Sequence, residues 1–315
     1  MDIEKAAQEL LVYLEGQGYS IHSLEWYRVS LRQFKKFLAG TGIRTVEEIT
    51  QQILYDYLLY LRNRPKMDGK PGKLSISAIN NGIKAIKGLF RYLCEVIETL
   101  PDNPTKKLKY LKSKHTVINS YTEAQVRAIL SVISQKTFSG QRNSMLIQLL
   151  VDTGLRISEA LSIRIKEIDF DKSLIKVVMG KGGKERMVPF GGNSKMLLER
   201  WIIAQSLIET NKIFFGKGTD KLSTASIRTS FRRYGKKAGL TISVRPHLFR
   251  HTFALMFLRN GGQIFALQKI LGHSTLEMTR HYVNMLTEDL QREYERCGPG
   301  DKLFRNDKDD ENNQE

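Results

Sequence analysis

Two arginines, Arg156 and Arg250, have the most constrained surroundings among the basic side chains of this sequence. Arg156 follows a Thr-Gly pair, typical of a helix-breaking turn, and a helical pattern starts at Ile157. Its guanidinium is therefore expected near a helix N-terminus, where backbone N–H groups also favour an anion. Arg250 shares one helical turn with His247 and His251. Because arginine carries a permanent charge on a planar fork that matches phosphate oxygens, both positions indicate phosphate chemistry.

Breaking a phosphodiester requires a nucleophile, compensation for charge on the non-bridging oxygens, and a proton for the leaving oxygen. The sequence has no carboxylate cluster of the kind that holds magnesium, so side chains would supply the positive charge. The spacing of His247 and His251 would suit zinc, but Leu248 stands where the metalloprotease pattern needs glutamate. Cys94 and Cys297 have no metal-ligand spacing, which favours reduced, incidental thiols. We therefore expect no metal and no other cofactor.

Four further residues are ambiguous when read alone. Glu159 can brace Arg156 across one helical turn, or the two can form an ordinary exposed ion pair. His273 follows Leu-Gly and precedes residues that can cap a helix, which predicts a loop and helix junction. A tyrosine at the position of Tyr282 is usually a half-buried packing residue. Lys181 lies in a glycine-rich turn whose spacing fails the Walker pattern of nucleotide-binding loops.

Three segments together resemble the tyrosine recombinase family, which includes phage integrases and Xer-like enzymes. They are TGLRISEAL at 153–161, HLFRHT at 247–252 and LGHSTLEMTRHY at 271–282, and GKGGKER at 180–186 resembles the family's lysine hairpin. In the family the arginines and histidines bind the scissile phosphate, the tyrosine attacks it, and the hairpin lysine donates a proton to the departing 5′ oxygen. The resemblance thus implies a catalytic set of Arg156, Lys181, His247, Arg250, His273 and Tyr282, with Glu159 in support.

The resemblance implies a site-specific DNA recombinase that cleaves and rejoins strands through a 3′-phosphotyrosyl intermediate, in integration, excision or resolution of DNA elements. Strand exchange implies double-stranded DNA with paired inverted half-sites. It also implies four protomers, which are either all identical or include a second recombinase.

Two rival functions remain. A type IB topoisomerase would relax one duplex by the same chemistry, and a non-enzymatic DNA-binding protein would need no particular tyrosine. His281 and the acidic tail have no family role that we can assign.

The charge of the chain is consistent with a nucleic-acid partner. Its 315 residues have a net charge of +17, and 41% of them are hydrophobic, enough for two ordinary domains with real cores. Residues 1–115 carry 19 basic and 12 acidic side chains, and residues 116–300 carry 28 and 15. A polyanion that contacts both halves would explain this balance, although a merely soluble basic protein would also fit. With neither a membrane-spanning stretch nor a signal sequence visible, we expect a cytoplasmic protein without membrane contact.

The elements that must position these residues are mainly α-helical. Apolar spacing predicts helices at 3–14, 23–39, 50–63 and 75–96, then at 122–134, 141–152, 194–208, 224–238, 247–259, 262–271 and 275–290. Short β-like runs at 174–178 and 186–189 predict a hairpin around 180–184. We therefore expect an N-terminal helical bundle, which the resemblance makes a SAM-like core-binding domain, and a mostly helical α+β catalytic domain with one small antiparallel sheet.

The predicted domain limits are 1–105 for the helical DNA-binding domain, 106–118 for a basic linker, 119–300 for the catalytic domain and 301–315 for a polar acidic tail. The composition of the tail predicts disorder. Candidate contacts to the DNA backbone lie on the linker, the hairpin and the helix at 224–238: Lys106, Lys107, Lys109, Lys112, Lys114, Lys184, Arg186, Arg228, Arg232, Arg233, Lys236 and Lys237. A solvated basic surface is the alternative for each of them.

Overall fold

The computed structural model describes residues 1–65, 72–112, 120–178, 185–205, 210–216 and 222–273, together with Thr275 and Thr279. The chain divides into two compact units, Met1–Thr116 and Val117–Glu315, and each has its own hydrophobic core. Within these described ranges, no helix combines the length and the apolar character that a membrane span requires. The predicted turn at 180–184, nearly all of the helix predicted at 275–290, and the tail at 301–315 lie outside the described residues.

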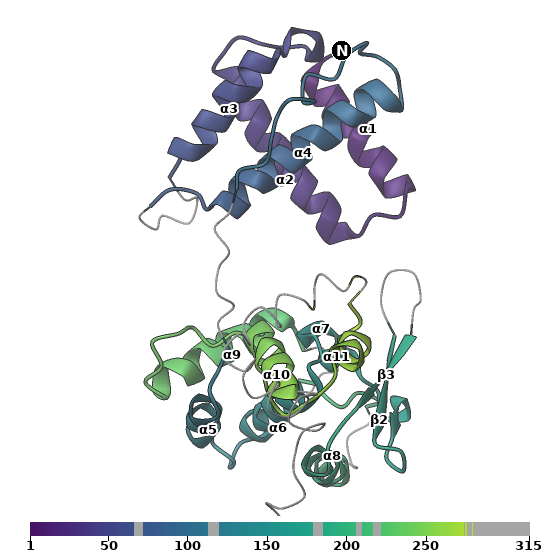
Figure 1. Cartoon of the computed structure of the whole chain (residues 1–315), viewed down its shortest axis with the longest axis vertical. Coiled ribbons are helices and arrows are strands. Elements are labelled where there is room, and N and C mark those ends of the chain that lie inside the picture. Colours follow the sequence, from purple (N-terminus) through teal and green to yellow (C-terminus); the bar gives the residue numbers. More distant parts are fainter. Residues whose placement is uncertain are drawn as a thin grey trace, which may run out of the picture. The chain divides into compact units, whose positions relative to one another are not determined.

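The first unit is a helical bundle (Figure 1). Its elements are α1 (Ile3–Gly16), α2 (Ile21–Ala39), the 3-10 helix η1 (Val46–Glu48), α3 (Gln51–Asn63) and α4 (Ile76–Glu95). The helix α4 packs against α1, α2 and α3, and its buried face runs from Ile79 to Leu93. The helix predicted at 23–39 begins two residues earlier, at Ile21, because the Ser20 hydroxyl caps it by accepting the N–H of Ser23 at 3.2 Å.

The second unit combines helices with one small sheet. Its elements are α5 (Glu123–Ser131), α6 (Phe138–Thr153), α7 (Ile157–Ser162), η2 (Ile165–Glu167), β1 (Ile168–Asp169), β2 (Leu174–Val178), β3 (Glu185–Pro189), α8 (Gly192–Ala204), α9 (Thr224–Lys237), α10 (Pro246–Arg259) and α11 (Ile264–Leu271). The sheet is antiparallel in the order β1-β2-β3, with Val177 opposite Arg186. These elements confirm the predicted fold class, including the two longer strands, whereas the two-residue β1 was not predicted.

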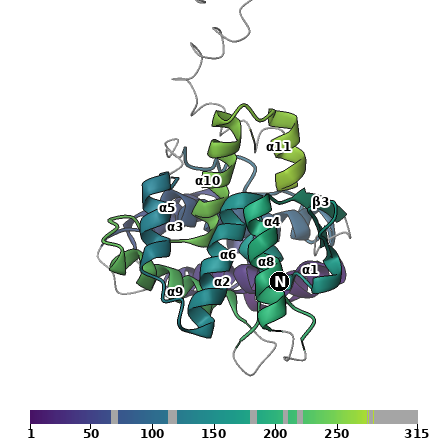
Figure 2. The same cartoon turned by 90° about the horizontal axis from the view of Figure 1, so that it is seen from below.

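The core of the second unit fixes the helices that carry the candidate site. The helix α10 packs against α6, and α11 packs against both α10 and β3. Figures 1 and 2 show α11 beside β3 from two directions. The helix predicted at 141–152 begins earlier, at Phe138, because the Thr137 hydroxyl caps it by accepting the N–H of Gly140. The ends of α6 and α11, the starts of α7 and α10, and β3 together surround the candidate site.

Candidate active site

A tight turn between α6 and α7 sets the position of Arg156. Gly154 ends α6 with a left-handed backbone (φ of 63°), and its N–H donates to the Leu150 carbonyl at 3.1 Å. A Cβ at Gly154 would lie 2.3 Å from Cδ1 of Phe253, so the backbone conformation and the available space both require glycine. Arg156 then occupies the N-cap position of α7, directly before the helix start at Ile157 that the sequence predicts.

Glu159 holds Arg156 at this helix start through two contacts. The backbone N–H of Arg156 donates to Oε2 at 2.8 Å, and Nη1 donates to Oε1 at 2.8 Å. The pair is not an ordinary exposed one, because the Glu159 side chain is 10% exposed while that of Arg156 is 34% exposed. The predicted bracing contact is therefore present, with a buried carboxylate behind a guanidinium that reaches toward solvent.

Arg186, on β3, is a second cation on Glu159. Its Nη1 and Nη2 donate to Oε1 and Oε2 at 3.0 and 2.8 Å, and its Nε donates to the Ile270 carbonyl at 2.8 Å. Burial alone would raise the pKa of Glu159, but hydrogen bonds from Arg186 and from the Arg156 N–H lower that pKa to about 2. The sequence predicts Arg186 as a contact to the DNA backbone, whereas the structure directs its guanidinium into the fold, with 9% of the side chain exposed.

Arg250 is almost completely buried, at 2% exposure, and two helix ends hold it. Nη1 donates to the Gly154 carbonyl at the end of α6 at 2.8 Å, and Nη2 donates to the Leu271 carbonyl at the end of α11 at 2.7 Å. Carbonyl groups at helix C-termini lack intrahelical partners and carry partial negative charge, so they suit a cation. Arg250 therefore ties together the two turns that precede Arg156 and His273.

The histidines of α10 lie one turn apart on the same face. The ring centroids of His247 and His251 are 4.4 Å apart, with their planes at 71°. Burial and then the charges of Arg250 and Arg156 lower the pKa of His247. Burial, followed by the electrostatic effects of His247, Arg250 and His273, lowers the pKa of His251 to about 4. Both rings are therefore neutral at neutral pH. No three His, Cys, Asp or Glu side chains of the described residues form a group that could hold a metal ion.

His273 lies directly after α11, in the turn that Gly272 makes with a φ of 65°. Its Nδ1 is 2.9 Å from the Thr279 hydroxyl, a contact that fixes the ring. Burial, and then the charges of Arg250, Arg156 and Arg186, lower its pKa to about 4. His273 thus lies in a loop, as predicted, and it is close enough to all three arginines for their charges to lower its pKa.

Arg156, His247 and Arg250 line one cavity of about 620 Å³. The same cavity is lined by Arg228 and Arg232 of α9, and by Arg245, which occupies the N-cap position of α10 and was not predicted. A pocket with this many guanidinium groups and a neutral imidazole can bind phosphate oxygens and accept a proton. Lys181 and Tyr282, the remaining members of the predicted catalytic set, lie outside the described residues.

Comparison with known proteins gives a clear relationship. Residues 119–289 match the phage integrase family, and residues 7–95 match the phage integrase N-terminal SAM-like domain. The chain belongs to the phage integrase family. This membership confirms the resemblance found in the sequence motifs.

Relatives of this integrase-family chain include tyrosine recombinases over nearly its full length. XerA of Pyrococcus horikoshii is 30% identical and aligns with 92% of each chain, and XerC of Lacticaseibacillus casei is 27% identical over 91% of this chain and 96% of its own. The crystal structure of XerA recombinase is 25% identical, with a TM-score of 0.51, over 94% of this chain and 99% of that one. The Tn1549 transposon integrase, solved in complex with transposon right end DNA, shares the fold at 22% identity, with a TM-score of 0.73 over 94% and 99%.

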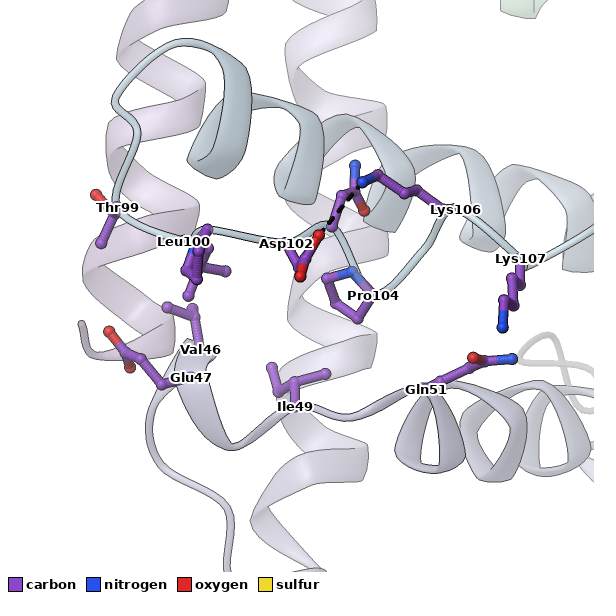
Figure 3. Close-up of a pocket in the computed structure, with 12 residues that line it drawn as sticks. Val46, Glu47, Ile49, Gln51, Thr99, Leu100, Asp102, Pro104, Lys106 and Lys107 are labelled. Atoms are coloured by element: carbon purple, nitrogen blue, oxygen red, sulfur yellow. Dashed lines mark hydrogen bonds and ion pairs between the residues drawn. The ribbon is translucent and has the colours of Figure 1, made fainter.

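The predicted DNA-contact residues of this integrase-family protein lie mostly at its surface. The basic residues of α9 are all exposed: Arg228, Arg232, Arg233, Lys236 and Lys237. Lys107, Lys109 and Lys112 are exposed as well, and Lys106 pairs with Asp102 at 3.4 Å on the wall of a separate hollow in the first unit (Figure 3). Lys114 and Lys184 lie outside the described residues. The neighbouring Leu108 is buried in the first core, so part of the predicted linker packs on the first unit.

A basic strip on α4 was missed by the sequence reasoning. Lys84, Lys87 and Arg91 recur at helical spacing, and Lys84 and Arg91 are exposed. The Nζ of Lys84 is 5.7 Å from the centroid of the Trp26 ring, and that of Lys87 is 5.4 Å from the centroid of Tyr110. Their spacing on a predicted helix was a visible signal, but the nearby aromatic rings come from other parts of the chain.

Proposed function

We propose that this protein is a site-specific DNA recombinase that cleaves and rejoins DNA strands through a 3′-phosphotyrosyl intermediate. The observation that carries the proposal is the convergence of Arg156, His247 and Arg250 on one cavity, with His273 beside them, in a member of the phage integrase family. These groups come from three distant segments of the chain, the start of α7, the start of α10 and the turn after α11, and they provide what a phosphodiester needs as negative charge grows on its oxygens.

In the proposed reaction, the Tyr282 hydroxyl oxygen attacks the scissile phosphorus, and the bond from phosphorus to the 5′ oxygen breaks. The Tyr282 proton passes to a base, for which His247 is suited because its lowered pKa leaves the imidazole neutral at pH 7. Lys181 donates the proton that the 5′ oxygen gains. Arg156 and Arg250 stabilise the charge on the non-bridging oxygens. The 5′ hydroxyl of a partner duplex then attacks the phosphotyrosyl bond and reverses these steps.

The DNA substrate in this proposal contacts both units. In the second unit, the arginines of α9 are exposed at the protein surface, and Arg228 and Arg232 also line the cavity that contains the proposed catalytic groups. In the first unit, the basic strip of α4 lies beside the segment with Lys109 and Lys112, because Asn80 holds the peptide of Leu111 by two hydrogen bonds of 2.8 and 2.9 Å. We infer a double-stranded substrate with paired inverted half-sites, and four protomers that are identical or include a second recombinase.

The test is to mix the protein, in a chelator, with DNA from around its own gene that carries a nick to trap the intermediate. We expect a covalent adduct that resists SDS, with mass spectrometry locating the DNA on Tyr282. Tyr282→Phe should form no adduct, and Tyr55→Phe, which alters an exposed tyrosine of α3, should react like the wild type. DNA binding without any adduct would overturn the proposal in favour of a binding protein.

A second measurement separates recombination from relaxation. Two duplexes of different length that carry the cleaved site should yield recombinant strands of new lengths. Relaxation of one supercoiled duplex, with no exchanged strands, would instead assign a type IB topoisomerase activity.

A further inference from the structure

Arg186 connects three parts of the site that are distant in sequence. It lies on β3, the strand that follows the predicted Lys181 turn. Its two terminal nitrogens bind Glu159, which holds Arg156, and its Nε binds the Ile270 carbonyl, two residues before Gly272. One buried side chain therefore contacts the brace of Arg156 and the end of the helix that leads to His273.

The contacts of Arg186 require a guanidinium group. Gly272 has a left-handed backbone, and a Cβ at this position would lie 3.0 Å from Cδ of Arg186, so the side chain passes directly against the turn. Lysine offers one compact ammonium at the end of its chain, which cannot bind both oxygens of Glu159 and also reach the Ile270 carbonyl in the same geometry. Lysine at 186 would thus keep the charge and lose the connection.

Glu159 needs both arginines to remain fixed. Each of its oxygens accepts one hydrogen bond from Arg156 and one from Arg186, so the four acceptor positions of the carboxylate are filled. Without Arg186, half of these contacts disappear and the carboxylate can rotate. Arg156 would then lose the rigid support that sets the direction of its guanidinium at the cavity.

We propose that Arg186 is a positioning residue for strand cleavage, which aligns Arg156 through Glu159 and the turn of His273 through the Ile270 carbonyl. This inference rests on the proposed recombinase function. Arg186 does not bind DNA in this proposal, although its position in a basic hairpin would favour such a role from sequence alone. Its loss is therefore expected to slow cleavage without weakening the binding of DNA.

The experiment compares Arg186→Lys and Arg186→Gln with the wild type in two assays on the same nicked DNA. We expect single-turnover cleavage to fall by about 100-fold in both variants, the cost of displacing a catalytic group by roughly 1 Å. We expect DNA affinity to stay within about threefold of the wild type, because no phosphate contact is lost. Lys176→Gln is the matched control, since it removes an exposed cation that pairs with Glu185 in the same sheet and should leave cleavage unchanged.

Two further readouts separate positioning from simple loss of stability. If Arg186 acts partly through Glu159, the double variant Glu159→Gln with Arg186→Gln should lose less cleavage than the two single losses combined, because the two residues share the contacts between them. Arg186 is the chief group that lowers the pKa of Glu159, so in Arg186→Gln this carboxylate should become protonated at a higher pH than in the wild type. Cleavage by Arg186→Gln should therefore decrease toward acidic pH, whereas cleavage by the wild type should not.

The outcomes are distinct. Circular dichroism shows whether each variant is folded, and Arg186→Lys decides the question if Arg186→Gln does not fold. Wild-type cleavage by folded Arg186→Lys, additive losses in the double variant, or equal losses of binding and cleavage would each overturn the positioning role. Absence of an adduct from the wild type would overturn the proposed recombinase function, and the inference with it.

Discussion

Replacing Glu159 with glutamine should destabilise the second unit in a manner that depends on pH. The substitution keeps the size and shape of the side chain but removes the charge that lies between Arg156 and Arg186. Two guanidinium groups would then face an uncharged amide, and Arg186, with 9% of its side chain exposed, would have little access to water. Removing one partner of a buried ion pair is among the costly single changes in a protein.

The magnitude follows from the pKa of Glu159, which the folded protein lowers from 4.5 to about 2. At about 1.4 kcal/mol for each pKa unit, the ionised carboxylate contributes about 3 kcal/mol to the free energy of unfolding. Because the folded pKa is the lower one, this contribution is complete above the unfolded pKa and is lost as the pH falls toward the folded pKa. About 2 kcal/mol of it should be gone by about pH 3.

The assay is urea unfolding of the wild type and Glu159→Gln at several pH values between neutral and about pH 3, where the linkage acts. Trp201 reports on the second unit, because it is buried in that core and donates to the Ile213 carbonyl at 2.8 Å. The sequence contains one other tryptophan, Trp26, so a Trp26→Phe background removes the signal of the first unit. The difference in unfolding free energy should be about 3 kcal/mol at neutral pH and shrink toward about 1 kcal/mol near pH 3.

Glu185→Gln supplies the control, because it removes a carboxylate that is 51% exposed from an ion pair with Lys176 in the same sheet. Such a surface pair should contribute less than about 1 kcal/mol, with little dependence on pH. A Glu159→Gln variant as stable as Glu185→Gln at neutral pH would refute the reasoning. So would a destabilisation that stays constant as the pH falls, because the cost would then not come from the carboxylate charge.

Three other outcomes are expected. Tyr121→Phe removes the hydroxyl that accepts the N–H of Arg245 at 2.9 Å at the start of α10. We expect the free energy of unfolding to fall by about 1 kcal/mol and cleavage to slow, while DNA affinity is retained. Unchanged cleavage would contradict this. Arg228→Gln combined with Arg232→Gln should weaken DNA binding and reduce the slope of log affinity against log salt by about 1.8, whereas an unchanged slope would remove both from the phosphate contacts. His273 should titrate in NMR with a midpoint near its pKa of about 4, and a midpoint above 6 would show that its ring is not buried among positive groups.

The sequence predicts best what depends on neighbouring residues. The contact between Arg156 and Glu159 spans one helical turn, so its spacing alone indicates the pair. The turn at Gly154 and the shared face of His247 and His251 are likewise local consequences of backbone geometry. For such features, a helical pattern and a turn residue are sufficient information.

Contacts between distant segments could not be predicted in this way. Arg186 is 27 residues from Glu159 and 84 from Ile270, and in the sequence it is one more cation next to a glycine-rich turn. Its burial depends on the packing of α11 against β3, which no local pattern encodes. Arg245 likewise lines the cavity only because the folded chain brings α9 and the start of α10 to the same cavity wall, which no local pattern around Arg245 encodes. Basic residues near a predicted site therefore need a tertiary structure before they can be divided into those that face solvent and those that support the site.

The arrangement also explains how three guanidinium groups can remain close together before any phosphate arrives. Arg156, Arg186 and Arg250 would repel one another in a medium of low dielectric, and one carboxylate cannot neutralise all three. Glu159 serves the first two, and the carbonyl ends of α6 and α11 serve Arg186 and Arg250 with partial negative charge. Because α6 and α11 each end in a left-handed glycine, their last carbonyl groups are turned toward these cations rather than continued into a helix. The site thus keeps a net positive charge that can bind a phosphate, while hydrogen bonds to Glu159 or to helix-end carbonyl groups fix each of the three arginines. Groups that are fixed in advance can stabilise the developing charge without rearranging during the reaction.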